Sequence, residues 1–148
     1  LKTVIAVVAG GLIMGTQGAA STGQVFAGFC VMLGHIYPVF YGFRGGKGVL
    51  CAETMLLIVS FPTGLVSLLI FVGIVWATRY VSLGSVAAAI SFPITTQLVF
   101  RDWGLTALGT CIALLVLWAH RSNIKRLLNG TESKFHFHVN GPKTGEDA

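Results

Sequence analysis

The sequence predicts an all-α integral membrane protein, a compact bundle of six short transmembrane helices. The first observation is composition: 54% of the 148 residues are hydrophobic and only 10% are charged. So few charges cannot cover a water-soluble globule of this size. The second is distribution, because the apolar residues form long blocks and the charged residues fall in short connections between them. This pattern is typical of a backbone that satisfies its own hydrogen bonds inside lipid.

Six apolar segments define the predicted helices. Several are shorter than the roughly 20 residues that an untilted helix needs to cross the hydrocarbon layer. We therefore expect local thinning of the bilayer or burial against neighbouring helices. Small residues such as Gly10, Gly11 and Gly84 would let the helices approach closely. The segments run approximately over residues 4–16, 24–41, 49–61, 63–78, 81–100 and 104–120.

The block from Val49 to Thr78 could form one long tilted helix or two short ones. Phe61-Pro62-Thr63-Gly64 in its middle has the chemistry of a turn. Two helices also place nearly all Lys and Arg residues on one side of the membrane, with Arg101 on the other. A single helix would divide the cations between both sides. The charges therefore favour a helical hairpin, with both ends of the chain in the cytoplasm.

This topology places every loop with reactive side chains on the cytoplasmic face. The predicted outer loops, Gly15 to Gly23, Phe61 to Gly64 and Arg101 to Gly104, are short and chemically plain. We expect residues 1–134 to form one transmembrane domain, and residues 135–148 to form a polar, disordered cytoplasmic tail.

The net charge of +5 does not indicate a nucleic-acid partner. Lys and Arg lie at predicted helix ends and loops, where they orient the protein and can meet anionic headgroups or phosphorylated substrates. The sequence has no basic stripe interleaved with aromatic residues, as single-strand binding requires. It also has no G-x-S-x-G or H-E-x-x-H motif and no complete metal-ligand set. A serine nucleophile and a metal mechanism therefore have no support.

The first group of candidate functional residues lies in the loop GHIYPVFYGFRGGKGV, from Gly34 to Val49. Three glycines around Lys47, just before a helix, would allow an anion close to free backbone N–H groups and to the helix dipole. Lys47 and Arg44 would supply the positive charge. The loop is not a Walker A motif, because Gly48 stands where Ser or Thr would bind magnesium. The alternative is a surface loop whose cations only orient the protein.

The second group lies in AHRSNIKRLLNGTESK, from Ala119 to Lys134. If the last span continues as a helix, His120 and Asn123 share one face. A neutral imidazole one turn from an amide can hold or deprotonate a hydroxyl group, or bind a phosphate oxygen. Asn129-Gly130 indicates the end of this helix. The alternative is a basic juxtamembrane anchor, which would not account for His120 and Asn123.

Two further polar residues lie within apolar segments. Ser82, in RYVSLGS, could cap the helix that follows it. Glu53 lies early in a span, where a carboxylate is costly unless it is paired or faces water. Its side chain is therefore expected either near the site or reaching the membrane interface.

Together these segments resemble the bacterial acyl-phosphate:glycerol-3-phosphate acyltransferases. GHIYPVFYGFRGGKGV resembles the second signature of that family, AHRSNIKRLLNGTESK the third, and RYVSLGS the short segment between them. The similarity extends over nearly the whole chain as far as Lys134. It implies a seven-helix family fold in the bacterial inner membrane, with the active site facing the cytoplasm. It also implies no cofactor: no nucleotide, metal or coenzyme A.

The resemblance implies a reaction and roles for individual residues. A fatty acyl group would pass from acyl phosphate to the 1-hydroxyl of glycerol 3-phosphate, giving lysophosphatidic acid and inorganic phosphate. Membrane lipid would surround the enzyme, and no obligate protein partner is implied. The catalytic residues would be His120, Asn123 and Lys47. The substrate-binding residues would be Arg44, Gly45, Gly46, Gly48 and Ser82, and the structural residues of the signatures would be His35 and Glu132.

The sequence departs from the family pattern in two places. The first signature, a Ser-Gly-Asn…Gly-Ala-Thr-Asn loop followed by an arginine, is absent, as is the helix before it. The resemblance therefore implies an N-terminally truncated domain that could be inactive alone, since that loop carries a serine and an arginine important in the family. Leu50-Cys51 replaces the usual Ala-Thr at the start of the following helix.

Two other classes of protein compete with an enzyme. A small membrane transporter would explain the bundle and Glu53, but it predicts polar residues in the middle of several spans, and these are scarce. A non-enzymatic anchor or assembly protein leaves the loop around Lys47, and the pair His120 and Asn123, unexplained.

Overall fold

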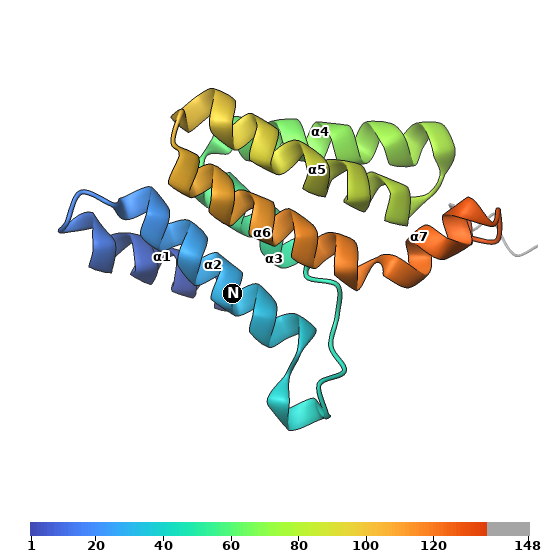
Figure 1. The fold of residues 1–148 in the computed structure, drawn as a ribbon, viewed down its shortest axis with the longest axis horizontal. Helices are drawn as coiled ribbons and strands as arrows, with labels where there is room; N and C mark the ends of the chain where they lie inside the picture. Colours follow the sequence, from blue (N-terminus) through green and yellow to red (C-terminus); the bar gives the residue numbers. More distant parts are fainter. Residues whose placement is uncertain (136–148) are drawn as a thin grey trace, which may run out of the picture.

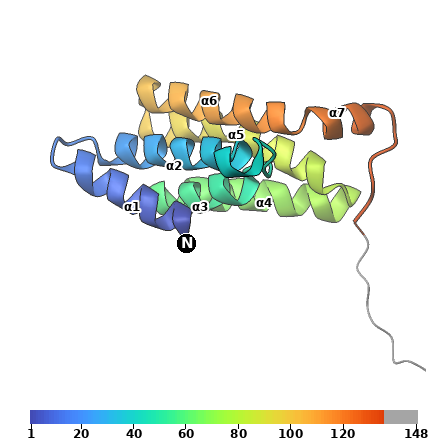
Figure 2. The ribbon, with the colours of Figure 1, turned by 90° about the horizontal axis from the view of Figure 1, so that it is seen from below.

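The structure, a computed structural model, describes residues 1–135 (Figure 1). The first six helices run alongside one another, and the seventh extends from the end of the sixth (Figures 1 and 2). The elements are α1 (Lys2–Gly15), α2 (Ala20–Ile36), a 3-10 turn η1 (Val39–Tyr41), α3 (Val49–Val59), α4 (Phe61–Thr78), α5 (Val81–Phe100), α6 (Trp103–Ala119) and α7 (Arg121–Leu128).

The helices have the length and surface of a membrane bundle. Ala20–Tyr41, Phe61–Thr78 and Val81–Phe100 are long and apolar enough to cross a membrane, and α6 with α7 makes a fourth candidate span. Large apolar side chains point outward, as with Leu12 and Leu98, which are 71% and 72% exposed. Helices that are apolar on nearly every side are typical of membrane spans. The predicted all-α membrane fold is confirmed.

The block from Val49 to Thr78 forms two helices, as the charges predicted. Ser60 alone separates α3 from α4, and its Oγ accepts a hydrogen bond from the Thr63 hydroxyl at 2.9 Å. Pro62 lies in the first turn of α4, where the missing N–H leaves no bond unmade. The predicted loop from Phe61 to Gly64 is wrong, because these residues already form that turn.

Close packing depends on small residues where α1 and α2 cross. A Cβ atom on Gly10 would collide with the Gly23 carbonyl oxygen, and one on Gly23 would collide with the Gly10 carbonyl oxygen. The two backbones are therefore in direct contact, as the glycines of the first segment predicted. The central core joins buried side chains from five helices, among them Val7, Met32, Met55, Phe92 and Ile112.

The last predicted span ends where expected and a short helix follows it. α6 ends at Ala119, and α7 turns away from it by 62°. The condition under which His120 and Asn123 would share one face of a continuous helix is therefore not met, since His120 lies at the bend. α7 ends where Asn129-Gly130 predicted, and Gly130 takes a left-handed conformation with φ 68°.

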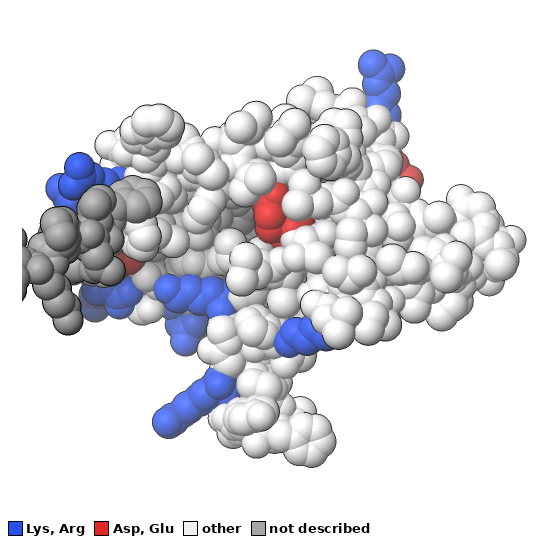
Figure 3. Space-filling view, turned by 180° about the vertical axis from the view of Figure 1, so that it is seen from behind, with Lys and Arg blue, Asp and Glu red and all other residues white. Residues whose placement is uncertain are grey.

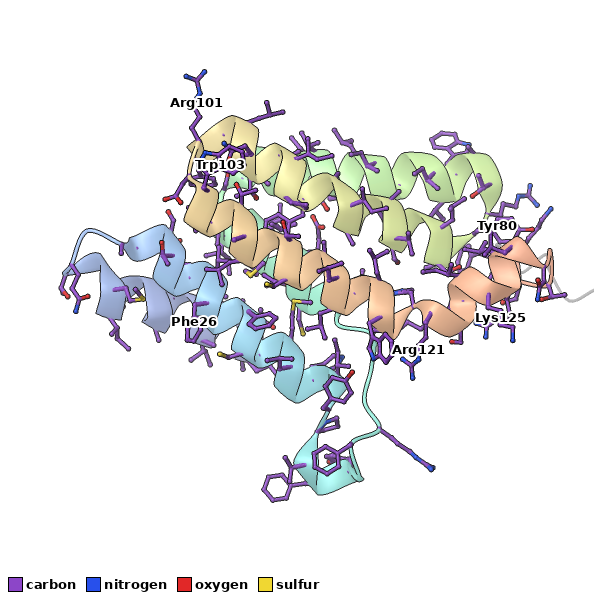
Figure 4. All side chains as sticks on the ribbon, viewed as in Figure 1. Phe26, Tyr80, Arg101, Trp103, Arg121 and Lys125 are labelled. Carbon is purple, nitrogen blue, oxygen red and sulfur yellow. The ribbon has the colours of Figure 1, made fainter. Side chains whose placement is uncertain are left out.

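Cationic residues lie mostly at one end of the bundle (Figure 3). Figure 4 shows Arg121 and Lys125 at the α7 end and Arg101 at the opposite end. At the α7 end, the Phe135 backbone N–H donates to the Arg79 carbonyl at 2.8 Å. The predicted tail beyond Phe135 lies outside the described residues.

Candidate functional site

A polar pocket opens where the starts of α3 and α5 meet α7. Its volume is about 430 Å³, and it brings together residues that the sequence separates by up to 88 positions, from Lys47 to Phe135. Of the sequence-predicted site residues, five line it: Lys47, Ser82, His120, Asn123 and Glu132.

Glu132 is the centre of the hydrogen-bond network in this pocket. The Ser82 hydroxyl donates to its Oε1 at 2.6 Å, and the Asn123 amide donates to the same oxygen at 2.7 Å. Arg126 Nε donates to Oε2, also at 2.7 Å. The hydrogen bonds from Ser82 and Asn123 lower the pKa of Glu132 to about 2. The carboxylate therefore remains ionised at neutral pH and fixes side chains from α5 and α7.

Ser82 does not cap α5. The helix begins at Val81 with Tyr80 at its N-cap, so Ser82 lies inside the first turn. Its hydroxyl is turned toward Glu132 rather than toward the helix's own N–H groups. The capping prediction is wrong because the helix begins one residue before Ser82. The Ser82 hydroxyl instead donates to the ionised carboxylate of Glu132, which follows α7, in a charge-assisted hydrogen bond.

Asn123 offers the pocket a buried acceptor. Its side chain is 5% exposed, and its amide group must donate to Glu132 because an ionised carboxylate only accepts. Its carbonyl oxygen Oδ1 is then left without a hydrogen-bond partner among the described residues. A buried polar atom without a partner is rare and costly. A hydroxyl or N–H group of a bound molecule would satisfy it.

His120 is held at the bend between α6 and α7. It is 2% exposed, and its Nδ1 lies 2.9 Å from the Val116 carbonyl oxygen. A carbonyl only accepts, so Nδ1 carries the proton in this bond. In the neutral ring, Nε2 is then an acceptor. The pocket thus combines two acceptors with the ammonium group of Lys47.

The remaining residues of the glycine loop lie elsewhere. Arg44, Gly45 and Gly46 line a second hollow of about 270 Å³ together with His35 and Lys2. The Lys2 ammonium lies 3.1 Å from His35 Nδ1. The two cations of the predicted phosphate-binding loop therefore line different pockets, Lys47 the first and Arg44 the second.

The backbone N–H groups of this loop are not free. Gly45 donates to the Ile36 carbonyl and Gly46 to the His35 carbonyl, each at 3.2 Å. The predicted cradle of free N–H groups is wrong at these two positions, because they cap the end of α2 instead. Gly48 has φ 77°, a conformation that glycine adopts without strain, and it turns the chain into α3.

Several lining residues were missed from the sequence. Ser85 follows Ser82 by one turn of α5, which is a signal that could have been read. Leu50, Phe71 and Phe135 also line the pocket, but nothing in the sequence distinguishes them from other apolar residues. Among residues 1–135, no cluster of three or more His, Cys, Asp or Glu side chains could hold a metal ion.

Glu53 lies half-buried on α3, next to this pocket. It lines a small cavity of about 30 Å³ that shares Val49 and Ser85 with the pocket wall. The Ser67 hydroxyl donates to Glu53 Oε2 at 3.0 Å, and Oε1 is buried without a partner among the described residues. Of the two positions expected from the sequence, Glu53 thus takes the one near the site.

The fold and pocket together define a class: an integral membrane protein with an open pocket, lined in part by polar side chains, at one end of its helices. Residues 1–130 match the profile of a family described as glycerol-3-phosphate acyltransferase. The chain belongs to that family, which confirms the resemblance of its two long motifs.

Individual relatives agree with this assignment. The glycerol-3-phosphate acyltransferase of Syntrophomonas wolfei is 42% identical over 127 residues, covering 84% of this chain and 65% of that protein. The enzyme of the same name from Thermoanaerobacter sp. is 42% identical over 134 residues, covering 90% and 65%. The chain thus spans slightly less than two thirds of the length of these curated relatives.

A solved structure has the same fold. The crystal structure of PlsY, an integral membrane glycerol 3-phosphate acyltransferase, in its glycerol 3-phosphate form matches with a TM-score of 0.81 at 35% identity. The match covers 91% of this chain and 68% of PlsY. Its lysophosphatidic acid form matches with the same TM-score.

Proposed function

We propose that this protein transfers a fatty acyl group from acyl phosphate to the 1-hydroxyl of glycerol 3-phosphate, giving lysophosphatidic acid and inorganic phosphate. The observation that carries the proposal is the pocket in which Lys47 lies with two acceptors, Asn123 Oδ1 and His120 Nε2. A substrate with a phosphate and free hydroxyl groups satisfies all three. The family relationship supports the same substrate.

Acyl phosphate is a mixed anhydride and already activated, so the protein has mainly to position two anions and stabilise developing charge. The hydroxyl oxygen attacks the acyl carbonyl carbon, and the bond from that carbon to the phosphate oxygen breaks. The hydroxyl proton finally resides on the released phosphate. Lys47 stabilises phosphate charge, and His120 and Asn123 hold the attacking hydroxyl group.

The other signature residues position this centre. Ser82 fixes Glu132, and Glu132 holds the Asn123 amide nitrogen, so that Oδ1 remains available as an acceptor. Gly48 turns the chain so that Lys47 precedes α3, while Gly45 and Gly46 fix the loop to α2. Arg44 lies with His35 and would bind a second phosphate group as the substrates enter.

The proposal includes an orientation in the membrane. The pocket and most cations lie at one end of the bundle, and Arg101 lies at the other (Figure 4). The positive-inside bias therefore favours the pocket end in the cytoplasm of a bacterial inner membrane. Residues 1–134 would form the transmembrane acyltransferase domain.

The test is an assay of membranes that contain this chain, supplied with glycerol 3-phosphate and either acyl phosphate or acyl-coenzyme A. Because the chain spans 65% of the Thermoanaerobacter relative, a chimera supplemented with the remaining third of that protein is assayed in parallel. Lysophosphatidic acid formed from acyl phosphate alone supports the proposal. No product from either form, with both inserted in the membrane, would overturn it.

A matched pair of variants assigns the activity to the pocket. Lys47→Gln should reduce the rate at least about a hundredfold, since removing one preorganised charge costs roughly 3 kcal/mol of transition-state stabilisation. Arg101→Gln removes a cation at the opposite end and should leave the rate unchanged. Equal rates for the two variants would exclude Lys47 from the reaction.

A further inference from the structure

The corner between α6 and α7 carries a surface that the proposed reaction does not use. Leu114 and Trp118 on α6 are 60% and 58% exposed, and Arg121 and Lys125 on α7 are exposed as well. Leu114 and Trp118 lie four residues apart on α6, and Arg121 and Lys125 lie four apart on α7, so each pair shares one side of its helix. The contact between Arg121 and Trp118 joins the two pairs. Figure 4 shows Arg121 and Lys125 along one edge of the molecule. We call these four residues the α6–α7 corner.

The corner changes from apolar to cationic over a short distance. The Arg121 guanidinium lies over the Trp118 ring, with 4.8 Å between its carbon and the ring centroid. One of its N–H groups donates to the Trp118 carbonyl at 3.0 Å. A guanidinium has five N–H donors, so this bond orients the group and leaves donors for an incoming anion.

Among residues 1–135, no carboxylate forms a salt bridge with Arg121 or Lys125. Within residues 1–135 the structure contains one salt bridge, from Arg126 to Glu132, on the pocket side of α7. Asn123 is only 5% exposed, so the side of α7 that carries it packs against the rest of the protein. Arg121 and Lys125 therefore present two cations, directly above exposed apolar side chains of a membrane span.

We propose that the α6–α7 corner binds an anionic phospholipid. The headgroup phosphate would lie between the Arg121 guanidinium and the Lys125 ammonium, and an acyl chain would lie along Trp118 and Leu114. A soluble anion would match only the cationic half of the corner, whereas a lipid matches both halves. Anionic lipids bind where an indole ring lies at the level of the headgroups and basic residues lie just beyond it.

The test measures lipid contact and requires no acyl transfer, so its outcome is separate from that of the enzyme assay. The chain has three tryptophans. Trp76→Phe/Trp103→Phe leaves Trp118 as the only tryptophan, and its emission is excited selectively in detergent–lipid micelles. Brominated phosphatidylglycerol should quench Trp118 at a mole fraction about tenfold lower than brominated phosphatidylcholine requires, because two cations lie near the headgroup. Salt should reduce this preference.

The opposite end of the bundle provides the matched control. Trp103 is 77% exposed and lies near Arg101 there (Figure 4). Trp76→Phe/Trp118→Phe reports on Trp103, for which the two lipids should quench about equally. Adding Arg121→Gln/Lys125→Gln to the Trp118 reporter should remove the preference for phosphatidylglycerol. Equal quenching of Trp118 by the two lipids, or a preference that survives this double substitution, would overturn the proposal.

Discussion

At the residue scale, Glu132 shows how one charge organises the pocket. It accepts hydrogen bonds from Ser82, Asn123 and Arg126 while its side chain is only 6% exposed. The sequence indicated a structural role without revealing these partners. They come from three separate turns of helix, and only the folded chain brings them together.

Replacing this carboxylate tests its role. In Glu132→Gln an amide N–H group would face the Arg126 donor, and the fixed position of Asn123 would be lost. Charge-assisted bonds of this kind contribute about 1.5–3 kcal/mol each, so we expect the acyl-transfer rate to fall about tenfold to hundredfold. Arg126→Gln removes the cationic partner of Glu132. Because the Arg126 side chain is 46% exposed, this change should reduce the rate less than threefold. Steady-state rates with saturating acyl phosphate provide the comparison.

The same residue predicts a response to acid. The pKa of Glu132 in the folded protein is about 2, below the value of about 4.3 for glutamate in an unfolded chain. Its stabilisation is therefore fully present above that unfolded value and is lost as the pH falls toward the folded one. Thermal unfolding midpoints in detergent should decrease between pH 5 and about pH 3. The decrease should be smaller in Glu132→Gln, and identical pH profiles would contradict this account.

Replacing Glu53, unlike losing the charge of Glu132, should stabilise the fold. Its Oε1 atom is buried without a partner among the described residues, and a carboxyl group inside a span is costly. Glu53→Leu should therefore raise the unfolding midpoint, because an apolar side chain of similar size replaces an unsatisfied group. Ser67→Ala, which removes the bond at 3.0 Å, should not raise it. A lower midpoint for Glu53→Leu would show that the cavity supplies a partner.

At the scale of elements, the glycine loop and α2 act as one unit. The Gly45 and Gly46 N–H groups bond to the last carbonyls of α2, and a Cβ atom on Gly46 would lie 2.5 Å from His35 Nε2. The loop position, and with it the approach to Lys47, is therefore set by contact with the His35 ring.

This contact can be tested with a compensating pair. Gly46→Ala should displace the loop and raise the KM for glycerol 3-phosphate about tenfold, since a side chain cannot fit against the ring. Gly46→Ala/His35→Ala should recover most of the loss. Gly34 lines the same hollow, and a Cβ atom added there would have open space around it. Gly34→Ala should therefore leave the KM unchanged. Failure of the double variant to recover would mean that the contact does not position the loop.

The helices were largely predictable and the pocket only in part. Apolar blocks and charge placement predict the bundle and the α3–α4 hairpin, because lipid imposes both. The one-residue break at Ser60 and the bend at His120 depend on local bonds that composition does not reveal. The motifs identified Lys47, His120 and Asn123, which do line one pocket. The separation of Arg44 from Lys47 could not be predicted, since it depends on which carbonyls the loop meets.

At the scale of the whole molecule, two of the apolar helices are too short to cross a membrane. α3 has 11 residues and α1 has 14, which corresponds to about 16 Å and 21 Å at 1.5 Å per residue. A typical hydrocarbon layer is about 30 Å thick. The surrounding bilayer must therefore thin, or polar ends of these helices must be covered by neighbours.

Bilayer thickness should accordingly change stability. We expect a higher unfolding midpoint in vesicles of lipids with chains of about 14 carbons than in those with about 22, because mismatch costs fractions of a kcal/mol per Å. The headgroup is kept the same, so that only thickness changes. Midpoints that do not depend on chain length would show that neighbouring helices already shield the short ones.

The position of Glu132 also has a consequence for the synthesis of the protein. Its bond to Ser82 joins residues 50 positions apart, and α7 lies between them. Translation proceeds from the N-terminus, so every helix from α1 to α7 has been made before Glu132 emerges from the ribosome. A nascent chain that has begun to insert therefore has Lys47 and His120 but no carboxylate to fix Asn123. The hydrogen-bond network of the pocket is therefore completed only after helices α1 to α7 have all been synthesised.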